Sequence, residues 1–176
     1  ESVHHLVDLL PSLEVALENE DMEAEVIVLE NGDFSESENF VANRFPQFRH
    51  QYSGLNHYLF SLNHIVANLS TDFVMILNDD MLIENLGLKK SVGLLQKNPE
   101  LFGVNLRITD WDGQNDQSAV RDLSYRKGFY TSQWRLEKTE EVRYTLYPGG
   151  GSGVFRRSMF VELGGFDRLY FPAYAE

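Results

Sequence analysis

The chain has 176 residues, of which 43% are hydrophobic and 24% charged, which is the composition of an ordinary globular domain. Its net charge of -12, from 15 basic and 27 acidic side chains, argues against nucleic-acid binding, because neutralising phosphates requires clustered Lys and Arg. The absence of cysteine excludes disulfides, thiolate zinc sites and cysteine nucleophiles and fits a reducing compartment, so we expect a cytoplasmic protein, including one at the inner face of the membrane.

Helical and strand-like hydrophobic patterns alternate along the chain. Helical spacing of apolar residues marks the predicted helices, and short apolar runs between turn-forming residues mark the predicted strands. In chain order, the predicted elements are a helix over 3–17, a strand over 25–29, a short strand within 45–52, a helix over 55–69, a strand over 73–77, a helix over 86–97, a strand over 102–108, a strand at 154–155 and a helix over 157–163. We expect the first helix to bend or end near Pro11, because proline cannot donate the helical hydrogen bond.

This alternation predicts a single α/β domain with a mostly parallel sheet and crossover helices. Residues 125–147 break the pattern with many aromatic and charged side chains, and we expect an irregular binding loop there. The chain begins at Glu1 and ends at Glu176 within an aromatic-rich stretch. We therefore expect residues 1–176 to be a piece of a longer protein, cut at both ends.

The apolar run 73–77 leads directly into the polar triplet Asn78-Asp79-Asp80. So apolar a strand is typical of a sheet buried on both faces, and open α/β sheets bind ligands beyond the carboxyl ends of their strands. Adjacent carboxylates repel one another unless a cation lies between them, and Mg2+ or Mn2+ prefers oxygen ligands. The triplet therefore predicts a divalent metal site, and the alternative is a turn in which Asn and Asp act as caps.

Glu30 also ends an apolar run and is followed by Asn31 and Gly32. If its strand lies beside 73–77, Glu30 and Asp80 face the same crevice. An acid at this position can accept hydrogen bonds from a nucleobase N–H or a ribose hydroxyl. The alternative is a plain strand-to-helix turn.

The stretch from Gly149 to Glu176 combines a glycine-rich segment with an acid among aromatic residues. Glycine lets the backbone approach a ligand closely, and the acid is a candidate general base. A helix C-cap beside an aromatic edge of the core explains the same pattern.

These segments, in this order and at these separations, resemble glycosyltransferase family 2, and the resemblance covers nearly the whole chain. It implies the GT-A fold, a three-layer α/β/α sandwich with a mostly parallel central sheet. It also implies transfer of a sugar from a nucleotide-diphosphate donor to the hydroxyl of a carbohydrate or another acceptor, with inversion. The matching segments are Val26-Ile27-Val28-Leu29-Glu30-Asn31-Gly32, Ile76-Leu77-Asn78-Asp79-Asp80, Gly151-Ser152-Gly153-Val154-Phe155-Arg156-Arg157 and Leu163-Gly164-Gly165-Phe166-Asp167.

The resemblance implies roles for individual residues. Asp80 is the expected ligand of Mg2+ or Mn2+, with Asp79 as the second ligand. Glu30 stands where the family usually has Asp, and Glu176, or the residue that follows it, stands where the family has its catalytic base. The residues expected to bind the donor are Glu30, Asn31, Asn63, Asn78, Asp79 and Gly151.

The resemblance also carries expectations about the rest of the protein. The family's usual first strand is missing before Glu1. Any peripheral association with a membrane is expected through regions outside this chain. Trp111, Trp134 and several Tyr residues would shape the acceptor side, where aromatic faces stack on sugar rings, or would form a satellite core.

Two other functions stay open on the sequence. A sugar-nucleotide nucleotidyltransferase shares the sandwich architecture but carries an N-terminal glycine-rich phosphate loop with a basic residue, which is not visible here. A non-catalytic module that binds carbohydrate or protein would keep the sheet without turnover. A non-acidic residue after Glu176 would favour that module.

Overall fold

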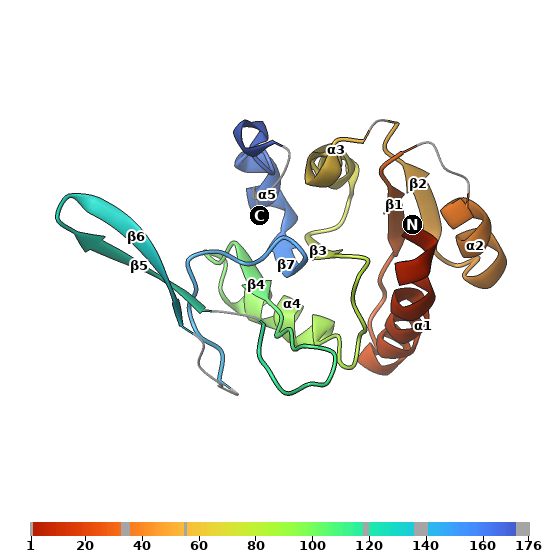
Figure 1. Cartoon of the computed structure of the whole chain (residues 1–176), viewed down its shortest axis with the longest axis horizontal. Helices are drawn as coiled ribbons and strands as arrows, with labels where there is room; N and C mark the ends of the chain where they lie inside the picture. The colour runs from red at the N-terminus through yellow and green to blue at the C-terminus, as the bar shows by residue number, and fades with distance from the viewer. Residues whose placement is uncertain (1, 33–35, 55, 118–119, 136–140, 172–176) are drawn as a thin grey trace.

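The structure is a computed structural model of the chain and describes residues 2–32, 36–54, 56–117, 120–135 and 141–171 (Figure 1). The helices within these ranges are α1 (Ser2–Glu20), α2 (Glu36–Arg44), α3 (Ser61–Asn68), α4 (Leu88–Lys97) and α5 (Arg157–Glu162), with short 3₁₀ turns η1 (Tyr58–Phe60) and η2 (Arg168–Tyr170). The strands are β1 (Ile27–Glu30), β2 (Arg49–Tyr52), β3 (Phe73–Leu77), β4 (Gly103–Asn105), β5 (Val120–Arg126), β6 (Phe129–Arg135) and β7 (Ser152–Arg156). None of the helices in the described ranges is long and apolar enough to cross a membrane.

The strands form small sheets in which most pairings are antiparallel. β1 pairs with β2 in parallel, β5 pairs with β6 as an antiparallel hairpin, and β7 lies between β3 and β4, antiparallel to both. The chain is therefore mixed α/β, but the prediction of a mostly parallel sheet is wrong for the described strands. Hydrophobic pattern locates a strand along the chain, whereas the lateral place of β7 depends on contacts between residues far apart in sequence.

α1 is a continuous helix of 19 residues that passes through Pro11, so the helix does not end there. Leu9 and Leu10 before the proline and Leu13 after it are all buried. Burying each such leucine contributes about 1.5–3 kcal/mol. Together they offset the cost of about 3 kcal/mol for proline in a helix interior.

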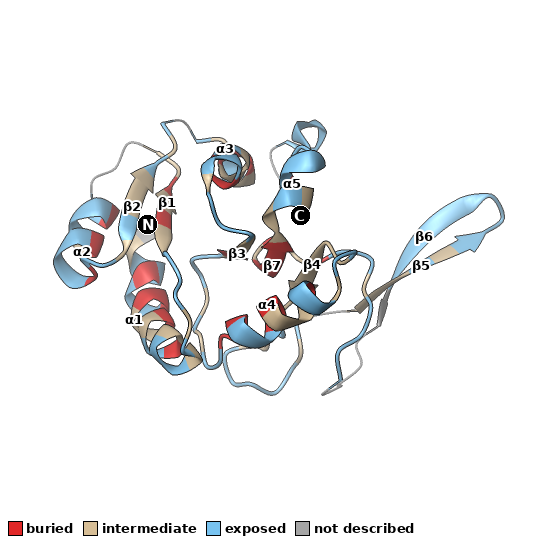
Figure 2. Ribbon diagram, turned by 180° about the vertical axis from the view of Figure 1, so that it is seen from behind, coloured by how far each residue is buried: buried red, intermediate tan, exposed pale blue. Residues whose placement is uncertain are grey.

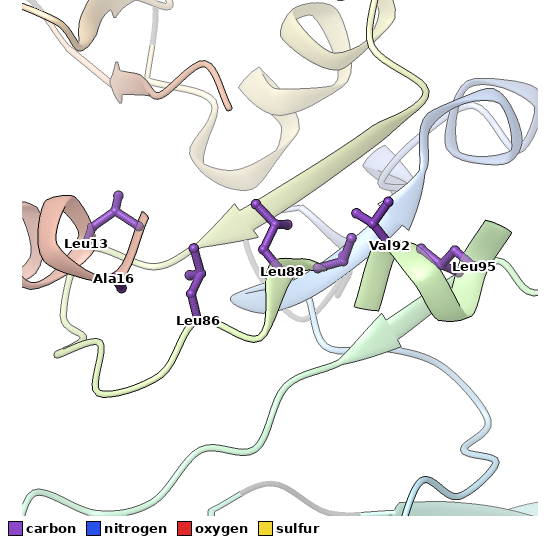
Figure 3. Close-up of a cluster of buried hydrophobic side chains, with 7 residues drawn as sticks. Leu13, Ala16, Leu86, Leu88, Val92 and Leu95 are labelled. Carbon is purple, nitrogen blue, oxygen red and sulfur yellow. The ribbon is translucent and has the colours of Figure 1, made fainter. Parts of the chain in front are cut away.

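Two core clusters meet along α1. Its N-terminal half packs against β1 and α2, and its C-terminal half packs against α4 and the loop before it (Figure 3). The first cluster consists of Leu6, Leu9, Leu10, Val28, Val41 and Phe45. The second consists of Leu13, Ala16, Leu86, Leu88, Val92, Leu95 and Val154. α1 therefore connects the β1–β2 pair to the β3–β7–β4 sheet, although β1 and β3 do not pair with one another in the described residues.

A third cluster covers the other face of the β3–β7–β4 sheet. It consists of Phe60, Val66, Ile76, Phe155, Phe160 and Phe166. Because successive strand residues point to opposite faces, Phe155 joins this cluster while its neighbour Val154 joins the second one. The sheet therefore has helices on both faces, with α1 and α4 on one and α3 and α5 on the other.

The other predicted elements are confirmed with changed bounds, and α2 is an addition. The helix predicted from residue 55 begins as α3 only at Ser61, after a turn in which Tyr58 has a positive φ of 52°. The strand predicted over 102–108 is confined to β4. The hydrophobic pattern did not predict α2, because its only buried residues are Ser37 and Val41.

Residues 120–135 form the β5–β6 hairpin, so the prediction of an irregular loop over 125–147 is wrong for residues 125–135. Residues 141–147 have no helix or strand, as predicted, and residues 136–140 lie outside the described ranges. Lys127 and Gly128 make the turn of the hairpin with positive φ values of 53° and 85°, the conformation that suits a tight hairpin. The hairpin extends away from the rest of the chain, and most of it is exposed (Figure 2). Because neither face is buried, the sequence lacks the alternation of apolar and polar residues that reveals a strand.

Candidate functional site

The acidic triplet lies at the C-terminal end of β3, and Asn78, Asp79 and Asp80 are all exposed. The backbone N–H of Asn78 donates to the carbonyl of Gly151 at 2.9 Å, which extends the pairing of β3 with β7. The Asn78 side chain lies against Gly151, where a β-carbon would come within 2.6 Å of its amide nitrogen. Asn78 can therefore occupy this position beside Asp79 and Asp80 because Gly151 has no β-carbon.

Asp79 and Asp80 have no hydrogen-bond or ion-pair partner within the described ranges. No group of three or more His, Cys, Asp or Glu side chains that could hold a metal occurs in that part of the chain either. Mg2+ is commonly held by one or two carboxylates, with water and substrate phosphates in the remaining positions. The donor set of Asp79 and Asp80 thus fits a divalent ion whose coordination is completed by a ligand.

Asn105 ties the glycine-rich segment to the same end of the sheet and was not among the predicted site residues. Its Oδ1 accepts hydrogen bonds from the backbone N–H of Gly149 at 3.0 Å and from the hydroxyl of Ser152 at 3.3 Å. Like Asn78, Asn105 directly follows apolar residues at the end of a strand. That position was the available signal in the sequence.

Glu30 ends β1, and only 8% of its surface is exposed. The hydroxyl of Ser37 on α2 donates to its Oε2, and the Ser37 oxygen lies 3.0 Å from Nε2 of His50 on β2. Since the hydroxyl has one hydrogen, His50 Nε2 is the donor in the second contact. This Glu30–Ser37–His50 network fixes the carboxylate, which can still accept further hydrogen bonds.

Asn31 carries a buried acceptor. Its Nδ2 donates to the carbonyl of Tyr58 at 3.1 Å. Because a carbonyl can only accept, the side-chain atom that faces it must be the nitrogen, and the remaining polar atom is the oxygen Oδ1. Oδ1 is buried and has no hydrogen-bond partner among the residues that the structure describes. Leaving a buried acceptor unpaired costs about 1–3 kcal/mol, so Asn31 is well placed to accept a hydrogen bond from a ligand or a water.

The aromatic end of the described chain lies beside Asn31. The ring of Tyr58 meets the ring of Phe171 edge-on, with centroids 5.7 Å apart, and Phe60 lies 5.9 Å from Phe171. Phe171 is the last described residue, so the predicted base, Glu176, lies outside the described ranges.

Asn63 of α3 binds the turn formed by the glycine pair. Its Nδ2 donates to the carbonyl of Phe166, and its Oδ1 accepts from the N–H of Phe166, both at 2.8 Å. Gly165 has a positive φ of 74°, and a β-carbon there would collide with the Asn63 amide. Both polar atoms of Asn63 are thus engaged by the turn before Asp167, and its contact with a donor stays a prediction.

The two halves of the candidate site share a core cluster. Met81, which follows Asp80, packs against the first cluster, to which Val28 of β1 belongs. The loop that leaves the acidic triplet therefore lies against the same core cluster as Val28 of β1. β1 and β3 remain unpaired in the described ranges, so the predicted direct neighbourhood of the two strands is not observed.

A hollow of about 370 Å³ lies at the opposite end of β3 from the acids, lined in part by Phe73, Arg156 and Arg157. Arg156 donates to the carbonyl of Leu95 at the end of α4, and Arg157 donates to the carbonyl of Thr71 at 2.8 Å. Both arginines thus bind backbone carbonyls that follow or end helices. The hollow is separate from the candidate site, and its two arginines already bind backbone carbonyls.

Comparison with known proteins does not identify a family for this chain. No protein-family model matches the chain, and no curated protein sequence matches it. The candidate site residues form two groups, the acidic triplet with Gly151 and Asn105, and Glu30 with Asn31.

Proposed function

We propose that this chain belongs to a metal-dependent glycosyltransferase that moves a sugar from a nucleotide-diphosphate donor to an acceptor hydroxyl with inversion. The observation that carries the proposal is the pair of exposed carboxylates of Asp79 and Asp80, which lack partners in the described part of the chain. In a chain of net charge -12, a diphosphate would be repelled by these acids. A divalent cation between acids and diphosphate turns that repulsion into binding.

The proposal includes the GT-A fold. Helices on both faces of the β3–β7–β4 sheet support it, as does the unpaired edge that β1 and β3 each have within the described ranges. Strands as apolar as these usually have a neighbour on each side. Figure 1 shows β3 as the strand of its sheet that lies nearest the β1–β2 pair, and one further strand between β1 and β3 would make a single sheet.

The reaction would be a single displacement. The acceptor oxygen forms a bond to the anomeric carbon while the bond from that carbon to the diphosphate breaks on the opposite face. Asp80 and Asp79 would hold Mg2+ or Mn2+, which as a Lewis acid offsets the charge growing on the diphosphate. A carboxylate at or just after Glu176 would take the acceptor proton, a contribution of about 10²- to 10⁴-fold.

Glu30 and Asn31 would bind the nucleoside part of the donor. The Oδ1 atom of Asn31 is a buried acceptor without a described partner, and it suits a nucleobase N–H or a ribose hydroxyl. The Glu30–Ser37–His50 network would hold the neighbouring carboxylate in one orientation. Preorganised acceptors of this kind lower the entropy cost of binding.

Calorimetric titration of UDP, GDP and dTDP, with and without Mn2+, tests the proposal. At least one nucleoside diphosphate should bind more tightly with the metal, and Asp80→Asn should remove that gain. Asp72→Asn is the matched control, because Asp72 is an exposed acid at the other end of β3. If no nucleoside diphosphate gains affinity from Mn2+, or if Asp80→Asn behaves like the control, the proposal is wrong.

A further inference from the structure

The β5–β6 hairpin is a basic arm on an acidic molecule. Residues 120–135 contain four basic side chains and one acidic side chain, which are Arg121, Arg126, Lys127, Arg135 and Asp122. The hairpin therefore carries a formal charge of +3, and the rest of the chain carries -15, since the total is -12. This segregation of charge is separate from the acidic triplet and from the proposed transfer reaction.

Aromatic rings surround the tip of the hairpin. Tyr125 and Tyr130 oppose each other across the strands on one face, with ring centroids 4.9 Å apart. Phe129 precedes Tyr130 in β6 and therefore points to the opposite face. Tyr125, Tyr130 and Phe129 are 65%, 72% and 73% exposed, and Arg126 and Lys127 at the turn are exposed between them.

The hairpin is anchored only near its base in the described part of the chain. The N–H of Leu146 donates to the carbonyl of Arg121 at 2.8 Å, and the N–H of Arg121 donates to the hydroxyl of Thr145 at 3.0 Å. Beyond these bonds, the hairpin extends away from the core (Figure 1, Figure 2). An isolated two-stranded hairpin is marginally stable in water, so an exposed aromatic tip indicates a partner.

We propose that the tip, residues 125–130, docks in the headgroup region of a bilayer that contains anionic phospholipid. Tyr125 and Phe129 point to opposite faces, so one flat protein surface cannot cover both, whereas a lipid interface surrounds an inserted tip. Aromatic rings favour the interface, and Arg126 and Lys127 are attracted to anionic headgroups. The acidic remainder of the chain is repelled by the same surface, so the tip approaches first and sets the orientation.

Co-sedimentation of the 176-residue chain with vesicles tests this docking. The chain should pellet with vesicles of equal phosphatidylcholine and phosphatidylglycerol and should stay in solution with phosphatidylcholine alone. Added salt should weaken the binding without abolishing it, because salt screens the charges and leaves the aromatic contacts. Reversing both charges of the tip, Arg126→Glu with Lys127→Glu, should weaken binding at least about 25-fold, because each basic residue near an anionic surface contributes about five-fold. Phe129→Ala with Tyr130→Ala should weaken the binding that persists in salt.

The matched control is Lys90→Glu with Lys97→Glu, which makes the same change in charge at exposed positions of α4. This control should pellet like the unmodified chain, and the circular dichroism of all three variants should be unchanged. Equal binding to neutral vesicles, or equal loss in the tip and control variants, overturns the proposal. The proposal is also overturned if the chain does not bind vesicles and instead forms a salt-sensitive dimer, detected by light scattering, or is retained on an acidic polysaccharide. The partner of the tip would then be a second copy of the chain or the polysaccharide.

Discussion

Asn63 and Phe166 lie 103 residues apart and are joined by two hydrogen bonds between one side-chain amide and one backbone unit. The amide pairs with the Phe166 backbone as a neighbouring strand would, and so connects α3 to the turn that follows α5. Because Phe166 belongs to the third core cluster, this pair connects that cluster to the turn before Asp167.

We expect Asn63→Ala to lower the free energy of unfolding by about 1–3 kcal/mol, because it leaves the backbone groups of Phe166 partly buried and unpaired. Urea denaturation measures this loss, and hydrogen exchange should become faster at the Phe166 amide. Asn68→Ala on the same helix is the control, since the side chain of Asn68 donates to the His64 carbonyl at an exposed position. Equal losses in the two variants would contradict the role of Asn63.

Gly151→Ala tests how Asn78 is seated. A β-carbon at Gly151 would come within 2.6 Å of the Asn78 amide, so we expect Asn78 to be displaced and metal-dependent affinity for a nucleoside diphosphate to fall. Asn78→Ala in the same chain should relieve the clash and recover stability without recovering affinity. Calorimetry and thermal unfolding separate the two effects.

Gly93→Ala is the matched control for Gly151→Ala. Gly93 lies inside α4, and nothing lies within 4 Å of the position where its β-carbon would be. Replacing an unstrained helical glycine by alanine stabilises a protein by about 0.4–1 kcal/mol. A Gly151→Ala variant that is stabilised in the same way, with full affinity, would show that the contact with Asn78 is dispensable.

Ser37→Ala should destabilise the fold by about 1–3 kcal/mol, because it removes the hydroxyl that donates to buried Glu30 and accepts from His50. Chemical denaturation near neutral pH measures the loss. Ser158→Ala, at an exposed serine of α5, should change stability by less than about 0.5 kcal/mol. A Ser37→Ala variant as stable as Ser158→Ala would show that the network does not hold Glu30.

The loop around Asp110 should respond only to strong acid. The backbone N–H of Asn115, its side-chain amide and the backbone N–H of Gln114 donate to the carboxylate and lower its pKa from 3.8 to about 2. Because the folded pKa lies below the unfolded one, these bonds stabilise the loop fully above pH 3.8, and that stability is lost as the pH falls through about 2.

Carbon-detected NMR of the Asp110 carboxyl group measures this titration. The midpoint should lie near 2 and should rise part of the way toward 3.8 in Asn115→Ala, which keeps the backbone donors and loses the side-chain donor. A midpoint of 3.8 in the unmodified chain would show that the loop is open in solution.

The sequence by itself determined most of the elements that bury several apolar residues on one face or on both, whereas α2, with Val41 as its only buried apolar residue, was missed. The apolar run 73–77 predicts β3, and the helical spacing of apolar residues before Lys97 predicts α4. Both are visible because the residues that are buried in an element must be apolar and recur at the spacing of that element. The polar residues at the ends of β1 and β3 were likewise visible, since a polar side chain directly after a run of apolar residues interrupts that period.

Only the tertiary structure decided the features that depend on residues distant in sequence. One is the place of β7 between β3 and β4. The others are the hydrogen bonds that connect Glu30 to Ser37 and His50, and those that connect Asn63 to the Phe166 backbone. No local sequence pattern predicts these features. Each depends on one or two residues that meet a distant partner, and so few residues produce no repeating pattern along the chain. The hairpin was missed for a related reason, since a pattern arises only where burial selects one face, and the β5–β6 arm buries neither.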